Sequence, residues 1–417
     1  MNDNQPDGSA DGSRAGRLLK HTFISLRNRN YKLFFIGQTI SNTGNWLTNV
    51  ALTLLILKIT GSGLAIGLLT ACQYGPVLLL SAWAGAVADR HDKRKMLLLT
   101  QSLEMTQSAS LAVLAFMPHP PMLGLYALAL IGGILLSFDN PLRRSFVSEM
   151  VKSEDLPNAI VLYSTIVNLA RIFGPALAGL LVVTLGYGWC FAIDAGTYSA
   201  VLLCLYLMRE EDLHRQPISS RGRGDVREGL RYVLSTPVLW ISFAMLAAIG
   251  TLSYNFNVTL PLFVTGPLHS TEGVFTLLYS LFSFGALVSA LVVANRSLVQ
   301  MGHVITGALA LGAAMLLLAF VPSVAPAVPV IFLLGISSIL YTTSTTTIVQ
   351  VEAKREMHGR VLALQSVLQM GTAPIGGPLC GWLADALGAR APIILGGIVC
   401  LLAAAFGYCA SRRYEVL

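Results

Sequence analysis

The sequence predicts an all-α membrane protein in which twelve transmembrane helices form two six-helix bundles. Three observations support this fold class: the composition, the length of the apolar runs and the placement of the positive charges. Of the 417 residues, 54% are hydrophobic and only 12% are charged, whereas soluble domains carry about 25% charged residues. One soluble core cannot bury so much apolar surface, so repeated membrane spans are expected.

Twelve apolar stretches are long enough to cross a bilayer as helices. Proline-rich breakers separate several of them, for example at 117–122 and 321–329. In chain order, the predicted helices are 33–57, 63–87, 96–117, 122–141, 158–185, 188–208, 238–265, 273–295, 303–321, 328–350, 360–386 and 391–410.

The positive charges indicate the orientation of these spans. With the N-terminus in the cytoplasm, 25 of the 28 Lys and Arg residues lie on the cytoplasmic side, as the positive-inside rule requires. Lys58 and Arg390 lie on the outer side, and Arg171 falls inside a span. Both termini are therefore predicted to be cytoplasmic. The net charge of +7 reflects this topology, so no nucleic-acid partner is expected.

A weak internal repeat supports the division into halves. An offset of 202 residues aligns glycines 174, 179 and 186 with glycines 376, 381 and 388. Parallel repeats of this kind relate two bundles by a pseudo-two-fold axis along the membrane normal. A short amphipathic helix on the membrane surface is expected from Asp225. The predicted parts are a cytoplasmic tail and juxtamembrane segment at 1–30, a bundle at 31–208, a cytoplasmic linker at 209–237, a second bundle at 238–410 and a cytoplasmic tail at 411–417.

Residue patterns for enzyme chemistry are missing from the sequence. The six cysteines lie in apolar segments without CxxC spacing or neighbouring histidines, so neither a metal nor disulfides are inferred. The sequence contains no phosphate-binding G-x-x-x-x-G-K-[ST] loop. We therefore expect no enzyme activity, cofactor or metal.

Ionisable residues within spans are functional candidates, because they are costly to insert into a membrane. Glu104 has no obvious local partner, which makes reversible protonation plausible. Asp139 can pair with Arg143 one helical turn further on. For Asp139 and Arg171, structural ion pairing is the alternative to a role in coupling.

The first span carries a polar stripe of Gln38, Asn42, Asn45 and Asn49. Their spacing of three and four residues places them on one helix face, and unsatisfied amides do not face lipid. The stripe either packs helices together or lines a cavity. Other candidates for a cavity wall are Tyr254, Asn257, Tyr341, Gln365 and Gln369.

Small residues and prolines recur in the fifth and eleventh spans, where they allow close helix approach and bending. They serve tight packing, a pivot between the halves, or both. The candidate pivot residues are Gly174, Pro175, Gly179, Gly376, Gly377, Pro378 and Gly381.

The segment "GAVADRHDKRK" at 85–95 resembles the link between spans two and three of the major facilitator superfamily. The segment 170–181 resembles the fifth-span motif of its exporters. The segments 26–52 and 139–159 look like the branch that contains the enterobactin exporter and macrolide-efflux-type proteins. Asp92 stands where the superfamily usually has glycine.

The resemblance implies an inner gate in which Asp89 meets cations after the fourth span and the start of the helix near Gly359. It also places the first span beside the central pathway, which favours a cavity wall for the amide stripe. The implied gate residues are Gly85, Asp89, Arg90, Arg94, Arg143 and Arg144.

The resemblance therefore implies a secondary active transporter in a bacterial inner membrane, which we expect to be monomeric. Its expected activity is proton-coupled efflux of amphipathic small molecules, such as a drug, macrolide or siderophore, by alternating access. Glu104, Asp139 and Arg171 are the candidates for coupling. Two alternatives remain open: a facilitator or importer of a polar metabolite, and a non-transporting membrane receptor or scaffold.

Overall fold

The computed structural model describes residues 23–88, 90–214, 225–293, 300–354 and 356–414, which contain helices and no strands. The first half contains the short 3-10 helices η1 (Ile24–Arg27) and η2 (Glu210–Asp212) and the helices α2 (Arg29–Thr60), α3 (Gly63–Ala88), α4 (Lys93–Ala115), α5 (Met122–Met150), α6 (Leu156–Thr184) and α7 (Tyr187–Tyr206). The second half contains α8 (Asp225–Ser235), α9 (Pro237–Leu252), α10 (Phe256–Thr265), α11 (Glu272–Val293), α12 (Met301–Ala319), α13 (Val324–Glu352), α14 (His358–Gly371), α15 (Ala373–Leu387) and α16 (Ala391–Arg413).

Local sequence accounts for several helix ends. The Asn28 side chain accepts hydrogen bonds from two backbone N–H groups at the start of α2, which is the usual function of an N-cap asparagine. The same helix ends at Gly61, whose φ of 61° lies in the left-handed region that glycine adopts without strain. Asp92 caps α4 by accepting a hydrogen bond from the Lys95 N–H at 3.1 Å. This cap gives a physical reason for an aspartate at the position where glycine is usual.

Two predicted helices are interrupted, and two continue beyond their predicted ends. The predicted helix 238–265 consists of α9 and α10, which the segment 253–255 separates. The predicted helix 360–386 breaks at Thr372, between α14 and α15. The prediction ended α5 at residue 141, but the helix continues to Met150, because Arg143 and Glu149 in the extension form buried ion pairs with residues of α4. The last helix likewise continues to Arg413, into the predicted tail.

Within the described ranges, nine segments are long and apolar enough to cross a membrane. One of them, Pro237–Thr265, comprises both α9 and α10. The helices α2, α4, α14 and α15 are not among these segments. The polar stripe explains the lower hydropathy of α2, and polar residues such as Gln101, Glu104 and Gln107 explain that of α4.

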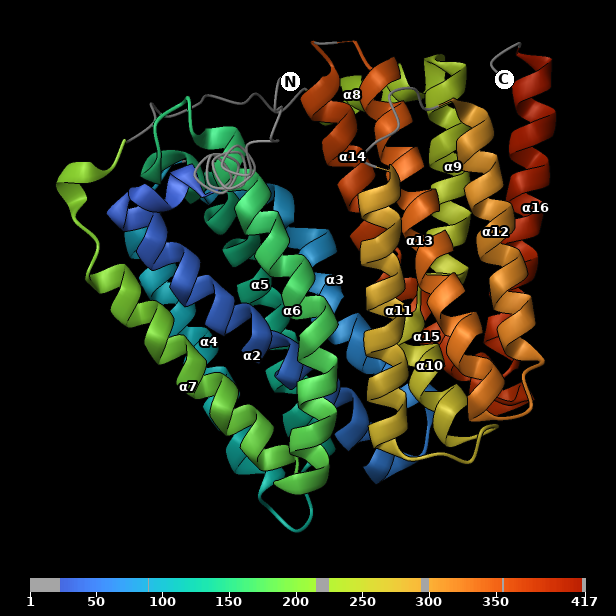
Figure 1. Ribbon diagram of the computed structural model, residues 1–417, viewed down its shortest axis with the longest axis horizontal. Coiled ribbons are helices and arrows are strands. Elements are labelled where there is room, and N and C mark those ends of the chain that lie inside the picture. The colour runs from blue at the N-terminus through green and yellow to red at the C-terminus, as the bar shows by residue number, and fades with distance from the viewer. Residues whose placement is uncertain (1–22, 89, 215–224, 294–299, 355, 415–417) are drawn as a thin grey trace, which may run out of the picture.

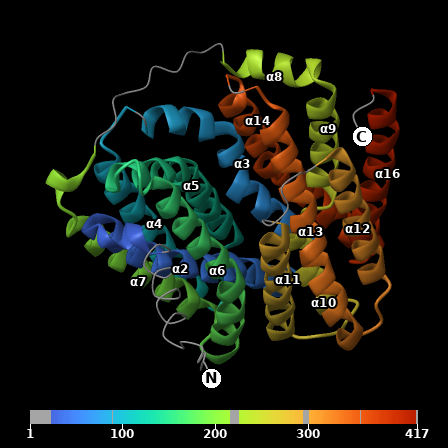
Figure 2. The same ribbon diagram turned by 45° about the horizontal axis from the view of Figure 1, so that its top comes forward.

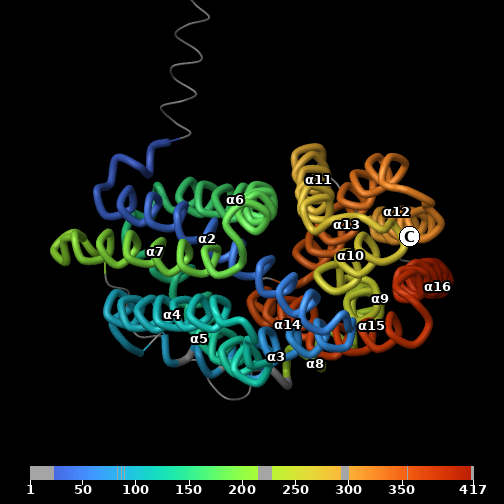
Figure 3. The backbone as a smooth tube through the Cα atoms, turned by 90° about the horizontal axis from the view of Figure 1, so that it is seen from below, coloured from blue at the N-terminus to red at the C-terminus, as the bar shows by residue number. Residues whose placement is uncertain are grey.

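The helices form two groups that lie side by side (Figure 1). The view from below shows α2 and α4–α7 in one group, α9–α16 in the other, and α3 along the boundary (Figure 3). The helix expected from Asp225 is present as α8, and it lies across the ends of α14 and α9 (Figure 2). It is attached to α14 through an ion pair between Glu228 and Arg360 at 2.7 Å.

The two groups meet along α3 with α15 and along α6 with α11. In the first interface, glycines spaced four apart on each helix let the backbones touch. A Cβ atom added at Gly63 would lie 2.6 Å from the carbonyl oxygen of Gly381, and one added at Gly67 would lie 2.5 Å from that of Gly377. In the second interface, Gly179 faces the side chain of Thr276. Small residues therefore permit close approach in both interfaces.

Candidate functional site

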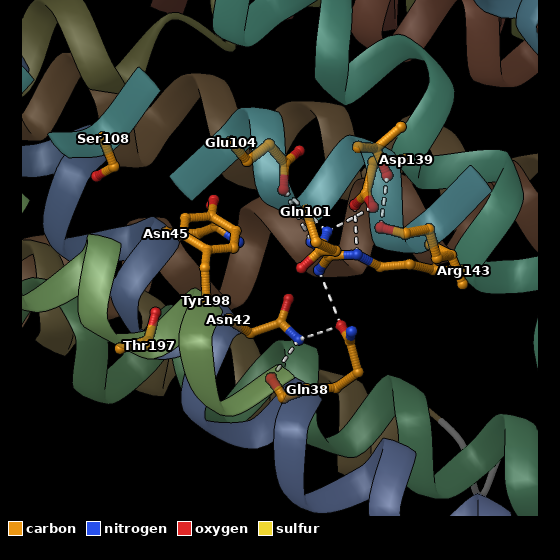
Figure 4. Close-up of polar contacts among 12 residues, drawn as sticks. Gln38, Asn42, Asn45, Gln101, Glu104, Ser108, Asp139, Arg143, Thr197 and Tyr198 are labelled. Atoms are coloured by element: carbon orange, nitrogen blue, oxygen red, sulfur yellow. Dashed lines mark hydrogen bonds and ion pairs between the residues drawn. The ribbon is translucent and has the colours of Figure 1, made fainter. Parts of the chain in front are cut away.

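The main cluster of buried charges lies inside the first half, where α2, α4 and α5 meet (Figure 4). Arg143 forms an ion pair with Asp139 on the same helix and approaches Glu104 of α4, with 3.5 Å between Nη2 and Oε2. Its Nη1 donates to the Oε1 atom of Gln38 at 2.8 Å. Gln101 donates to both carboxylates, at 2.9 Å from Glu104 and 2.7 Å from Asp139. The expected pairing of Asp139 with Arg143 is confirmed, whereas the expectation that Glu104 lacks a partner is wrong.

The cluster has two carboxylates and one guanidinium group. Glu104 is 6% exposed, Asp139 is 1% exposed and Arg143 is 4% exposed, so water screens their charges little. If both carboxylates ionise, the cluster carries one uncompensated negative charge, which is costly at this depth. A single proton shared by the two carboxylates removes that charge.

A polar cavity of about 100 Å³ lies beside the cluster. Glu104 lines it, together with Asn45, Asn49 and Tyr74. Tyr198 also lines the cavity, and its hydroxyl donates to the Oδ1 atom of Asn45 at 2.7 Å. The cavity is large enough for water, so Glu104 borders both the ion-pair cluster and a polar space.

The amide stripe is therefore divided between two kinds of contact. Gln38 is 1% exposed and contacts protein rather than a cavity. Asn42 donates to the Gln38 carbonyl oxygen at 2.7 Å. Asn45 and Asn49 lie one and two turns further along α2, where they line the polar cavity. Gln38 and Asn42, at one end of the stripe, therefore serve helix packing. Asn45 and Asn49, at the other end, form part of a cavity wall.

The predicted lining residues of the second half, by contrast, do not line this cavity. Tyr341 and Gln365 are 0% and 2% exposed, so neither lines an open cavity in this conformation. Gln369 is exposed. Tyr254 lies in the break between α9 and α10, and its hydroxyl donates to the Ser338 carbonyl oxygen at 2.6 Å. Asn257 accepts a hydrogen bond from the Tyr279 hydroxyl.

Arg171 lies near the middle of α6 and is partly buried. Among the residues that the structure describes, no carboxylate lies within ion-pair distance of it. The structural ion pair considered for Arg171 is therefore not found in this part of the chain.

The charged link between α3 and α4 attaches helix ends to one another. Lys93 forms a buried ion pair with Glu149 of α5. Arg94 donates to the carbonyl oxygens of Leu205 and Tyr206, at 2.9 and 3.0 Å, where α7 ends. Cations at a helix C-terminus interact favourably with the helix dipole. These contacts stabilise the first half at this end.

The described members of the predicted inner gate do not contact one another in this conformation. Asp89 lies outside the described residues. Arg90 and Arg144 are exposed, and a Cβ atom at Gly85 would meet no atom within 4 Å. The described partners of Arg143 are those of the buried cluster, because its side chain turns inward along α5.

The candidate pivot residues do lie where helices approach closely. A Cβ atom at Gly174 would overlap Trp46 of α2, and one at Gly376 would overlap the Thr251 carbonyl oxygen. Gly377 and Gly381 face α3. Pro175 and Pro378 lie inside α6 and α15, respectively, where each removes one backbone hydrogen bond.

Asp385 joins the two halves at the end of the interface between α3 and α15. Its carboxylate accepts hydrogen bonds from the Ser62 hydroxyl at 2.6 Å and from the backbone N–H groups of Gly63 and Leu64 at 2.6 and 2.9 Å. A carboxylate of the second half therefore caps the N-terminus of a first-half helix. Nearby, the Tyr187 hydroxyl at the start of α7 donates to Glu272 at the start of α11.

The sequence predictions missed two features of this arrangement. Gln101 was not predicted, although it lies one helical turn before Glu104. The glycine pair Gly63 and Gly67 was also missed, although its G-x-x-x-G spacing is the known signal for close helix approach.

Comparison with known proteins gives the family. Residues 20–414 match the family model described as transmembrane secretion effector. The multidrug efflux pump Tap of Mycolicibacterium fortuitum is 27% identical, over 88% of this chain and 94% of the pump. The staphyloferrin A transporter of Staphylococcus aureus is 25% identical, over 92% and 97%. The enterobactin exporter EntS of Salmonella typhi is 24% identical, over 85% of each chain.

The fold matches solved transporters. A bacterial homologue of the human lysosomal transporter Spinster superposes with a TM-score of 0.73 at 15% identity, over 92% of this chain and 96% of that one. The match to the family model covers almost the whole chain, so the resemblance seen in the sequence is confirmed. The chain belongs to the transmembrane secretion effector family and is a multi-pass membrane transporter of the major facilitator type.

Proposed function

We propose that this transporter exports amphipathic small molecules, such as drugs or siderophores, across a bacterial inner membrane in exchange for protons. The names of the relatives support export: a multidrug efflux pump and an enterobactin exporter align over most of the chain. The observation that carries proton coupling is the buried cluster of two carboxylates and one guanidinium group beside a polar cavity.

The proposed topology has twelve spans, with both termini in the cytoplasm and the protein acting as a monomer. In this topology α9 and α10 form one interrupted span, and α14 and α15 form another. The polar helices α2 and α4 cross the membrane inside the first bundle, where neighbouring helices cover their polar faces. The positive-inside pattern supports this orientation.

In that orientation, the contacts of Asp385 with α3 close the outer side, and the structure represents an inward-facing state. The helices of the two groups converge at this end and diverge toward the other (Figure 1). Alternating access then requires the α3–α15 contact to open while the cytoplasmic ends approach each other. A closure that depends on hydrogen bonds to one carboxylate can open and close reversibly, because breaking these bonds does not leave a buried charge in lipid.

The cluster gives a route for coupling. In the outward-facing state, Glu104 takes up a proton through the polar cavity. In the inward-facing state it releases the proton to the cytoplasm, and the cluster regains its negative charge. One proton moving through 100 mV releases about 2.3 kcal/mol. A difference of one pH unit releases about 1.4 kcal/mol more. This free energy sustains roughly a 500-fold gradient of a neutral solute.

Transport into proteoliposomes tests the proposal. With inverted insertion, an acidic lumen is expected to drive uptake of a macrolide, enterobactin or staphyloferrin A. We expect Glu104→Gln to abolish the response of uptake to the pH gradient. Substrate exchange driven by a substrate gradient should be retained. Glu154→Gln is the matched control, because Glu154 is exposed. Uptake that is equal with and without the pH gradient, for every substrate, would reject proton antiport.

A further inference from the structure

We infer that Arg171 is the anion-binding residue of the substrate site, and that preferred substrates carry an acidic group on an aromatic or apolar body. This inference rests on the proposed transport function and adds a substrate class to it. This cation lies near the middle of α6, one helical turn before the residue that packs against Trp46, and the Trp46 ring contacts Tyr279 of the other half.

Arg171 lies at the depth expected for a substrate site. It is the only charged residue of α6, which spans Leu156–Thr184. At 1.5 Å per residue it lies roughly 20 Å from either end of the helix. Substrates of transporters built from two repeats bind near this depth, between the halves.

Within the described part of the chain, no carboxylate forms an ion pair with Arg171. The buried carboxylates of the first half have other partners: Glu104 and Asp139 contact Arg143, and Glu149 pairs with Lys93. Asp194 accepts hydrogen bonds from Thr48 and Ser108 at 2.6 and 2.8 Å. An intramembrane cation without a counter-charge must face water or a ligand.

The surroundings of Arg171 belong to both halves. One turn further along α6, Gly174 leaves room for Trp46 of α2. The ring of Trp46 lies 6.2 Å from that of Tyr279 on α11, and Tyr279 donates to Asn257 of α10. A ligand at Arg171 can therefore meet an aromatic ring of each half and the Asn257 amide of the second half.

This chemistry defines the ligand class. A guanidinium group binds planar anions through two parallel hydrogen bonds. Aromatic rings beside it favour a flat apolar body. Organic cations are repelled, because the described surroundings contain no carboxylate that pairs with Arg171. The site thus favours an aromatic or amphipathic acid over its neutral amide.

Binding of a matched ligand pair tests this inference with the purified full-length protein in detergent, without a proton gradient. The probes are 3-hydroxy-2-naphthoate and its neutral amide, and the measured quantity is the ratio of their dissociation constants. The wild type is expected to bind the acid at least tenfold more tightly than the amide, because charge-assisted hydrogen bonds are the stronger ones. Arg171→Gln is expected to abolish this preference, and Arg171→Lys to reduce it severalfold.

Arg209→Gln is the matched control, because Arg209 is exposed at the end of the first half, and it should keep the wild-type ratio. Equal binding of acid and amide by the wild type, or an unchanged ratio in Arg171→Gln, would overturn the inference. If Arg171→Gln does not fold, the ratio of the two dissociation constants measured for Arg171→Lys tests the inference instead. Antiport can fail in vesicles while the acid preference persists, so the two proposals are tested separately.

Discussion

The third helix of the first half and its counterpart in the second half differ in what they bury. Helix α4 buries Gln101, Glu104 and Ser108, whereas the buried residues of α12 are glycine or apolar, including Ala308 and Leu311. The glycine register of the halves is nevertheless the same: Gly186 and Gly388 precede α7 and α16 with φ angles of 89° and 93°. The repeat has preserved the positions where the backbone needs glycine, while the buried charged residues in the described part of the chain all belong to the first half. We therefore place the proposed proton coupling in the first half.

The largest expected effect comes from removing the guanidinium group of the cluster. Arg143→Met leaves two buried carboxylates without a counter-charge, which should destabilise the protein by about 3–5 kcal/mol. Unfolding in denaturant measures the loss. The triple variant Glu104→Gln, Asp139→Asn and Arg143→Met should recover much of the stability but not the coupling. Wild-type stability of Arg143→Met alone would contradict a charged cluster.

The two interfaces between the halves should differ in their tolerance of side chains. Gly67→Leu places atoms against the backbone of α15, which cannot rotate away, so outer closure and transport should fall more than tenfold. Gly179→Ala meets the side chain of Thr276, which can change rotamer, so only a severalfold loss is expected. Distances between spin labels on α3 and α15 report the closure. Equal losses in both variants would show that the interfaces are equivalent.

The contact of Asp385 with the start of α3 should bias the conformational equilibrium. Asp385→Asn weakens the hydrogen bonds of Gly63 and Leu64, and bonds to charged groups contribute about 1.5–3 kcal/mol each. We expect a roughly tenfold shift toward the outward-facing state, measured by the same spin-label distances. Asp212→Asn is the control, because Asp212 is exposed. Unchanged populations would remove Asp385 from the outer closure.

The smallest effect is expected at the cap of α4. Asp92→Ala removes the acceptor for the Lys95 N–H and should cost about 1 kcal/mol of stability. Transport should be retained. Asp92→Ser, which keeps a cap acceptor, should restore most of the stability. A loss of transport without a loss of stability would instead assign Asp92 to the gate.

Local patterns predicted the features that depend on neighbours along the chain. The apolar runs located the helices, and the i,i+4 spacing predicted the pair of Asp139 and Arg143. The break at Thr372 was not predictable in this way. It lies where Gly376 approaches the Thr251 carbonyl oxygen of α9, a contact between segments distant in sequence. The Arg143 partner of Glu104 was missed for the same reason, because Arg143 belongs to another helix, whereas Gln101 was missed although it lies one turn away on the same helix.

The sequence by itself determined the class of protein, the helical segments and the family, because hydropathy, charge placement and motifs are local properties of the chain. Only the tertiary structure decided which polar residues meet. It placed Gln38 in the ion-pair cluster and Asn49 beside a cavity, although both lie on the same stripe. It also left Arg171 without a carboxylate partner among the described residues. The physical reason is that the fate of a buried charge depends on which helices surround it, and that depends on packing between segments far apart in sequence.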